Sequence, residues 1–237
     1  MDIQNREKIY QLLRDAYFGD GQFEGGGALV KHERESAGNY VKRQSLAYYL
    51  NYTGPIVNAS VDPIFRNEIK REYNDTAKFK MFLDDADRTG ADLQNYIRRL
   101  AVMAKLYGVV YVVVNNETEL GETVQANLDK RALPYLVAVL PQEVTHWRFD
   151  ERGRLVEFGY KSTVKDSEDK PRVRYYLWTA TDWRVLDENK QVLRQGAHAL
   201  KRLPVVQWFG RSNDPMEVLP SPEFLSVAQT NYHVYGR

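Results

Sequence analysis

The stretch ADLQNYIRRLAVMAKLYGVVYVVV, residues 91–114, decides the fold class, because it joins a strong helix signal directly to a strong strand signal. Apolar residues recur three and four positions apart from Leu93 to Tyr107, which predicts an amphipathic helix over 91–107. Gly108 is the residue type favoured just after a helix. The valine-rich run 109–114 predicts a buried strand that begins at once.

Upstream of this unit the signals are mainly helical. Periodic apolar residues predict a helix over 3–17 and two more between 38 and 65, with a break near 51–55. Between them lies GDGQFEGGGALV, which has five glycines from Gly19 to Gly27, and we expect it to be a mobile loop.

Downstream of Pro134 the character changes to β structure. Alternating and β-branched residues predict a series of strands, with two strands and a hairpin turn at 187–190 in the part from 172 to 195. The other expected strands are 135–140, 143–150, 154–163 and 203–210. Helices followed by an antiparallel β meander predict an α+β fold. Pro220 and Pro222 then introduce a helix-like run, 223–235.

The composition excludes several classes of function. The chain has 33 basic and 32 acidic residues, a formal net charge of +1, and its basic pairs are scattered, so tight phosphate-driven binding of nucleic acid by this chain is not expected. Without cysteine it has no disulfide, no thiolate metal site and no cysteine nucleophile. The charged N-terminus is unlike a signal peptide, and the longest apolar run, 106–114, is too short to span a bilayer. We therefore expect a soluble, intracellular protein at synthesis.

The acidic segment DDADRTGADLQ invites comparison with a calcium loop. Asp85, Asp87, Thr89 and Gly90 match the first half of an EF-hand loop, but the position that must supply a bidentate glutamate is Tyr96. A structural role explains the same residues, because Thr89 can cap the following helix with a capping-box-like partner three residues later. We favour the helix cap over a calcium site.

Other candidate sites are equally incomplete. The glycine-rich segment lacks the GK[ST] of a phosphate-binding loop, and Glu24 stands where a dinucleotide fingerprint needs glycine. The spacing of Glu168 and Lys170 resembles that of a nuclease, but it falls in a polar loop, where a solvated role is preferred. The histidines are single and far apart, and an ordinary hydrogen-bonded role is expected for His146. They are His32, His146, His198 and His233. The sequence predicts no catalytic, cofactor-binding or metal-binding residue, and no enzyme.

The order of five local signatures resembles the portal proteins of tailed bacteriophages. YVKRQSLAYYLNYTGPIVNASVDPIF (40–65) is similar to the opening helices of that family. FLDDADRTGADLQNYIRRLAVMAKLYGVVYVVVNN (82–116) is similar to its acidic turn, amphipathic helix, Tyr-Gly stop and strand. LPYLVAVLPQEVTHWRFDERGRL (133–155) resembles its strand, proline corner and hairpin. LPVVQWFGRSNDP (203–215) and PSPEFLSVAQTNYHVYG (220–236) resemble its last strand and the entry into a stem helix.

This resemblance implies a division of the chain into three parts. Residues 1–37 would be a helix with a flexible glycine-rich loop, 38–219 a wing-like α+β domain, and 220–237 the start of a stem helix. No stem, clip, tunnel loop or crown follows Arg237 here, so we expect a fragment, a remnant or one piece of a split protein.

The resemblance also implies a function. Portal subunits form a ring, typically a dodecamer, at one vertex of the virion capsid, and double-stranded DNA passes through it during packaging and ejection without sequence specificity. Terminase, a head–tail adaptor, scaffold and the major capsid protein would be partners, largely through parts absent from this sequence. No cofactor and no membrane contact are implied, and assembly would take place in the host cytoplasm.

Two other functions remain open on the sequence alone. A metal-dependent nuclease of the packaging machinery would cleave DNA with Mg²⁺ or Mn²⁺ and lose activity on changing Glu168 or Asp169. A non-assembling protein-binding module would use the tyrosine-rich first hundred residues, including Tyr48, Tyr49 and Tyr52, because aromatic residues are enriched in interface cores.

Overall fold

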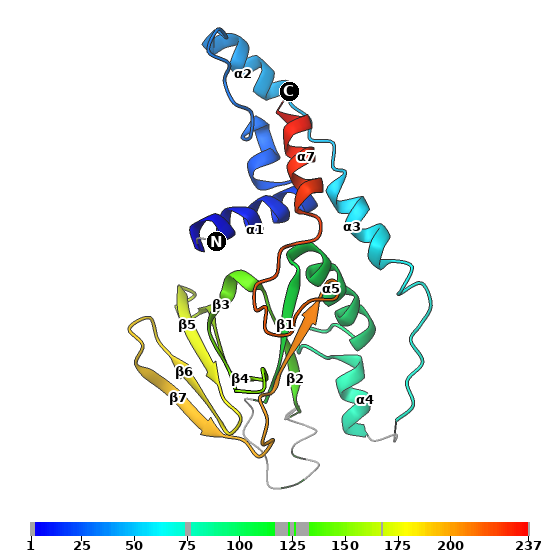
Figure 1. Cartoon of the computed structure of the whole chain (residues 1–237), viewed down its shortest axis with the longest axis vertical. Helices are drawn as coiled ribbons and strands as arrows, with labels where there is room; N and C mark the ends of the chain where they lie inside the picture. The colour runs from blue at the N-terminus through cyan, green and yellow to red at the C-terminus, as the bar shows by residue number, and fades with distance from the viewer. Residues whose placement is uncertain are drawn as a thin grey trace.

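The computed structural model describes residues 3–73, 77–116, 123, 126, 133–166 and 168–236 of the 237-residue chain. Helices and two antiparallel sheets make up the molecule, which confirms the predicted α+β class. In Figure 1 the sheets lie beside α4 and α5 in the lower half, and α1, α2, α3 and α7 lie in the upper half.

The elements follow the chain in this order: α1 (Ile3–Phe18), η1 (Gly21–Gly26), α2 (Ala37–Leu46), α3 (Thr53–Val61), α4 (Ala77–Asp84), α5 (Leu93–Tyr107), β1 (Val109–Asn115), β2 (Tyr135–Val139), η2 (Pro141–Glu143), β3 (Val144–Phe149), β4 (Leu155–Lys165), β5 (Pro171–Trp178), β6 (Asp182–Leu186), β7 (Val192–Ala197), β8 (Val205–Phe209) and α7 (Leu225–Tyr235). Helix α4 was not predicted from the sequence.

The α5–β1 unit folds as its sequence predicts, apart from the cap. Asp92, and not Thr89, is the N-cap, and its side chain accepts a hydrogen bond from the backbone N–H of Asn95 at 3.0 Å. Gly108 ends the helix with a φ of +90°, a conformation that only glycine adopts at low cost. A β-carbon there would lie 3.1 Å from the carbonyl oxygen of Pro220, so glycine also permits a close backbone approach.

Strand β1 is the centre of the molecule because both of its faces are buried. It lies between β2 and β8 in a three-stranded antiparallel sheet. Val110 and Val112 pack against α5, whereas Tyr111 on the other face lies 4.6 Å from Phe158 of the second sheet, measured between ring centroids. A strand that is covered on both faces has a continuous run of apolar residues, and this run is why the sequence predicts β1 so clearly.

The second sheet is a five-stranded meander in the order β3-β4-β5-β6-β7. The predicted meander is therefore confirmed for these strands, while β8 returns to β1. The part from 172 to 195 contributes to three strands, and not to the expected two, because a short turn at Thr179–Thr181 separates β5 from β6. The Thr179 hydroxyl accepts the N–H of Thr181 at 3.2 Å, so this turn is made without glycine or proline.

The glycine-rich segment is packed, so the prediction of a mobile loop is wrong. It forms η1, and Phe23 within it is only 3% exposed. Gly26 adopts a φ of +76°, and a β-carbon there would lie 2.8 Å from the Cα of Gln44. These glycines allow the backbone to approach α2 closely. From composition alone, glycines needed for close packing look the same as glycines of a flexible loop.

The helical half has a hydrophobic cluster that joins distant parts of the chain. Its buried members are Tyr10, Leu13, Ala16, Phe23, Ala28, Val57, Leu106, Tyr107 and Ala228. Residues from all three predicted parts of the chain therefore share one core. Ala228 of α7 is fully buried within this cluster, so the C-terminal helix packs on the rest of the chain.

Candidate functional site

Exposed apolar side chains gather at the upper end of the molecule, which we call the α2–α7 tip (residues 29–52 and 232–236). Figure 1 shows α2 projecting from the body, with the end of α7 beside its base. Tyr48 is 81% exposed and Leu46 73% exposed. Val30, Val41 and Val234 are also exposed apolar residues of this region. A contiguous apolar surface rimmed by polar groups is typical of an interaction site.

Polar contacts hold α2 in place. The helix has no buried residue, and Ser36 caps its start by accepting the N–H of Asn39. The Tyr40 hydroxyl donates to the carbonyl of Leu29 at 2.8 Å, and the Arg43 guanidinium donates to the carbonyl of Val30 at 2.9 Å. Apolar residues on the free side of α2 therefore do not contribute to the core of this chain.

Arg43 is fixed by a second contact with a carboxylate. Its Nε and Nη2 atoms donate to the two carboxylate oxygens of Glu35 at 3.0 and 2.8 Å. These hydrogen bonds lower the pKa of Glu35 and raise the pKa of Arg43. A bidentate pair of this kind restricts the guanidinium, so the positive charge at this edge of α2 has a defined position.

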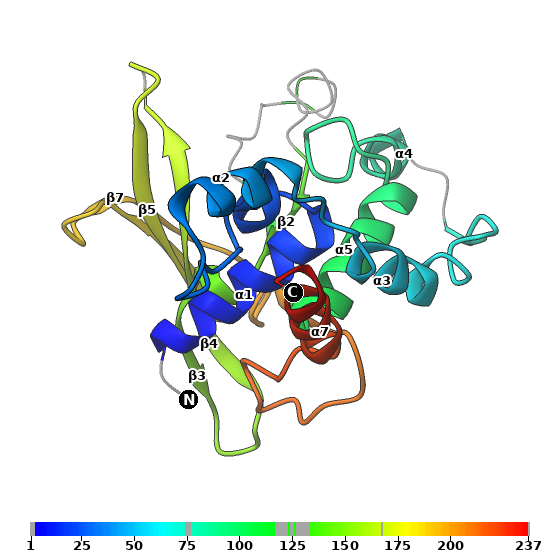
Figure 2. The same cartoon turned by 90° about the horizontal axis from the view of Figure 1, so that it is seen from above.

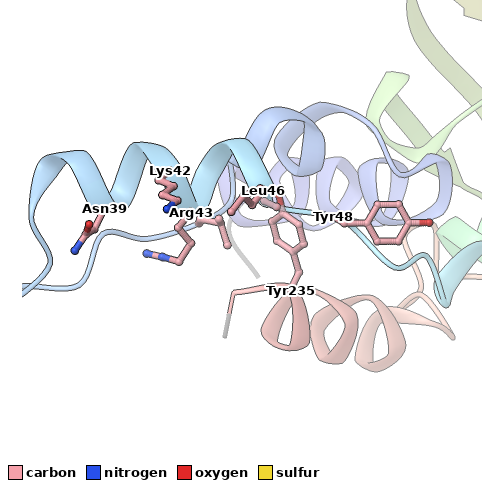
Figure 3. Close-up of a pocket in the computed structure, with 8 residues that line it drawn as sticks. Asn39, Lys42, Arg43, Leu46, Tyr48 and Tyr235 are labelled. Carbon is pink, nitrogen blue, oxygen red and sulfur yellow. The ribbon is translucent and has the colours of Figure 1, made fainter.

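A groove of about 440 Å³ runs between α2 and the end of α7. Its lining consists of Leu29, Asn39, Lys42, Arg43, Leu46, Ala47, Tyr48 and Tyr235. In Figure 3 Tyr235 projects from α7 toward α2, and Asn39, Lys42 and Arg43 extend from the side of α2 that faces α7. The groove therefore combines an apolar floor with a cationic rim, which suits an amphipathic protein segment that carries acidic residues.

The base of the tip is anchored by one buried amide. Asn231 of α7 is 3% exposed, and its Nδ2 donates to the carbonyl of Leu50 at 2.9 Å. Its Oδ1 accepts the backbone N–H groups of Tyr52 and Thr53 at 3.0 and 3.2 Å and lies 2.8 Å from the hydroxyl of Tyr49. A buried amide with these partners joins α7 to the α2–α3 connection.

The three tyrosines that the sequence grouped together have different environments. Tyr48 is exposed, whereas the ring of Tyr49 stacks on Phe23 with centroids 4.0 Å apart. Tyr52 is about half exposed, at 48%. Neighbouring residues in the extended connection point to opposite sides, so only Tyr48 and part of Tyr52 are available to a partner.

The acidic segment forms a turn in which the aspartate carboxylates accept hydrogen bonds from residues of the same segment. Asp87 Oδ1 accepts the N–H and hydroxyl of Thr89 at 2.9 and 2.8 Å, and Asp85 Oδ1 accepts the N–H of Gly90 at 2.9 Å. Arg99 pairs with the other oxygen of Asp87. Burial acts to raise the pKa of Asp87, but these hydrogen bonds outweigh it and lower the pKa. The contacts match the structural interpretation of the turn.

The nuclease candidates lie at the exposed tip of the β4–β5 hairpin. Glu168 pairs with Lys170 at 2.6 Å, and Asp169 pairs with Lys165 at 2.8 Å. Each carboxylate therefore faces a lysine rather than another acid. Across the described ranges of the chain, no group of three or more histidine, aspartate or glutamate side chains is placed to hold a metal ion.

The histidines remain separate in the fold. His146 lies 2.8 Å from a carboxylate oxygen of Glu157, which confirms the ordinary hydrogen-bonded role. His198 Nε2 lies 3.1 Å from the carbonyl oxygen of Thr179, and His32 Nδ1 accepts the N–H of Arg34. His233 packs edge-on against the ring of Tyr232.

Neither a protein-family model nor a curated protein matches this chain. Within the part of the chain that the structure describes, no helix has the length and hydrophobicity needed to cross a membrane. The sequence grouped Tyr48 and Tyr52 as a possible binding surface, but it did not reveal the groove with α7, because Tyr48 and Tyr235 are far apart in the chain.

Proposed function

We propose that the chain is a structural assembly protein, the wing of a tailed-phage portal subunit, which associates with copies of itself in a ring at the capsid vertex. Double-stranded DNA would pass through that ring during packaging and ejection. Terminase, the head–tail adaptor, scaffold and the major capsid protein would be its other partners. The order of the five family-like segments along the chain supports this proposal.

The observation that carries the proposal is the exposed apolar surface of the α2–α7 tip. In the single chain α2 buries none of its residues, yet Val41, Leu46 and Tyr48 extend from it and from the connection that follows. Burying a side chain of this size contributes about 2 kcal/mol. Contact with a neighbouring chain would therefore stabilise a part of the molecule that contributes little to its own core.

The test is the native mass of the purified chain, measured by light scattering over a range of concentrations, with negative-stain imaging of any large species. We expect closed rings with a central hole. The variant Leu46→Asp/Tyr48→Asp is expected to reduce the assembled fraction at least tenfold. Met216→Asp, at a residue 53% exposed on a loop away from the tip, is the matched control and should assemble normally.

Two outcomes would contradict this proposal. A monomer at every concentration would remove self-assembly, and equal assembly by both variants would remove the tip as its surface. The groove also favours a second candidate, a module that binds a different protein through the same tip. A stable complex with another capsid or host protein, formed by a chain that stays monomeric alone and lost in Leu46→Asp/Tyr48→Asp, would support that candidate instead.

A further inference from the structure

Helix α3 has apolar residues on its exposed side as well as on its buried side. Its sequence, TGPIVNASV, contains no charged residue. The buried side consists of Thr53, Gly54, Val57 and Val61. Pro55, Ile56 and Ala59 are exposed. A helix that is hydrophobic all round is usually covered all round. In the single chain α3 is covered on one side only, so its other side is suited to contact with a second molecule.

The exposed apolar surface continues beyond the end of the helix. We call it the α3 face, and it consists of Pro55, Ile56, Ala59, Pro63 and Ile64. Ile56 is 42% exposed and Ile64 63% exposed. Positions 56, 59 and 63 have the spacing of one helical side, so the small Ala59 lies between two larger residues. A small residue in this position leaves a shallow hollow into which a projecting side chain can pack.

Polar contacts fix α3 on the body of the molecule. At its start the N–H of Thr53 donates to Asn231 Oδ1 at 3.2 Å. In its middle the Tyr17 hydroxyl donates to Asn58 Oδ1 at 2.8 Å. At its end Asp62 pairs with Arg98 of α5. The α3 face is therefore already ordered in the single chain, and an ordered surface loses less conformational freedom when it binds.

We propose, resting on the ring assembly above, that the α3 face of one copy receives the α2–α7 tip of the next copy. Leu46 and Tyr48 of the tip, the two most exposed apolar residues of its centre, would pack on the uncharged surface around Ala59. An uncharged receiving surface suits them, because burying a charge beside them would carry a desolvation cost.

The charges around the two surfaces are of opposite sign. Residues 29–52 of the tip include four basic and two acidic side chains, a net charge of +2 with histidine neutral. Helix α3 and the turn that follows it, residues 53–68, include Asp62, Glu68 and one basic residue, Arg66, a net charge of −1. Opposite charges at the rim of a contact favour the correct pairing of surfaces over the contact of two tips.

The positions of the two surfaces are those that a ring requires. Figure 1 shows α2 at the upper end of the molecule, and Figures 1 and 2 both place α3 on the side opposite to β5 and β7. Two different surfaces of one chain form a heterologous, head-to-tail contact, which closes into a ring when the rotation between copies permits. A contact between two tips, in contrast, would be isologous and would end at a dimer.

A mixing experiment tests whether two different surfaces meet. The tip variant Leu46→Asp/Tyr48→Asp keeps an intact α3 face, and the variant Ile56→Asp/Ala59→Asp keeps an intact tip. We expect each full-length variant alone to lose at least nine tenths of its assembled fraction, measured by light scattering. An equimolar mixture should form dimers and nothing larger, because only one intact tip and one intact α3 face remain in each pair.

The absence of cysteine from the chain allows a second measurement that captures a weak contact. Tyr48→Cys and Ala59→Cys are made as separate full-length variants, mixed, and treated with a short bismaleimide. The mixture should give at least ten times as much cross-linked dimer as either variant alone. Val206→Cys in place of Ala59→Cys is the control, because Val206 is 57% exposed on β8 and lies outside both surfaces.

The matched control for the mixing experiment is Ser226→Asp/Gln229→Asp, which places two aspartates at the same spacing on exposed positions of α7. It should assemble like the wild type, and circular dichroism should show that all variants keep their helices and strands. Normal rings from Ile56→Asp/Ala59→Asp, or rings without a cross-link between positions 48 and 59, would overturn the inference and leave the proposed function intact. A wild-type monomer at every concentration would remove both.

Discussion

The meander of β3–β7 and the helical half of the molecule are built in different ways. In the meander each strand pairs with its neighbour in sequence, through short turns such as Asp187–Gln191. In the helical half, the contacts join α1 to α7 and the glycine-rich segment to Tyr235, whose hydroxyl donates to the carbonyl of Phe23 at 2.9 Å across 212 positions. One half is held by local contacts and the other by contacts between the two ends of the chain.

This difference teaches where the molecule can interact. Strands of the meander pair with their neighbours in sequence and leave β3 and β7 as the two edges of the sheet. The helical half joins its elements through a small set of aromatic rings and one buried amide, and α2 remains outside that core. The exposed apolar surface of the α2–α7 tip thus lies outside the core that joins the two ends of the chain.

Removing one buried phenylalanine from each region gives the largest expected effect. Phe158→Ala in β4 should lower the free energy of unfolding by about 4 kcal/mol, and Phe23→Ala in η1 by about 3 kcal/mol, because each leaves a cavity. Urea unfolding measures both. Hydrogen exchange should show that Phe23→Ala exposes α1 and α7 while β4 and β5 stay protected. Equal loss of protection in both regions would contradict the comparison.

Asn231→Ala tests the amide that joins α7 to the α2–α3 connection. It leaves the buried carbonyl of Leu50 and two backbone N–H groups without their partner, so we expect a loss of about 2.5 kcal/mol. Limited proteolysis should then cleave within α7 first. The control is Asn189→Ala at an exposed hairpin turn, which should change stability by less than about 0.5 kcal/mol. A similar small change for Asn231→Ala would exclude the proposed anchor.

Glu157 in the meander gives a pH dependence. Hydrogen bonds from Arg148 and then from His146 lower its pKa from 4.5 to about 2. A carboxyl whose pKa is lower in the folded state stabilises above the unfolded value, and this stabilisation is lost as the pH falls from 4.5 to about 2. Because the pair is partly exposed to solvent, we expect about 1 kcal/mol.

The measurement is urea unfolding across that pH range, with NMR titration of the Glu157 carboxyl. Glu157→Gln should lose this part of the acid dependence and leave the rest of the profile unchanged. A titration midpoint near the ordinary value of a glutamate would show that the two hydrogen bonds do not form in solution.

Tyr48→Ala should have the smallest effect on folding. The side chain is exposed, so its removal should change the free energy of unfolding by less than about 0.5 kcal/mol. Tyr49→Phe, one residue away, should cost about 1 kcal/mol because the hydrogen bond of its partly buried hydroxyl with Asn231 is lost. Comparable costs for the two variants would show that Tyr48 packs against its own chain.

The sequence predicted the elements that depend on local periodicity. The α5–β1 unit, the hairpin strands and the helix after Pro222 all follow from residue spacing and from turn residues. It failed where glycine has two meanings: the five glycines from 19 to 27 indicate flexibility by composition, but Gly26 is required for close packing against Gln44. It also gave no expectation of α4, and it assigned the cap of α5 to Thr89 in place of Asp92.

Hydrophobic periodicity and turn chemistry thus determined the α+β class, the helix-to-strand unit and the antiparallel order of β3–β7, because each depends on residues close together in the chain. Tertiary structure decided that Tyr49 packs against the core while Tyr48 is exposed, that β8 joins β1, and that Asn231 anchors α7. These depend on contacts between residues about 100 to 180 positions apart, whose pairing has no local periodicity that a single sequence displays.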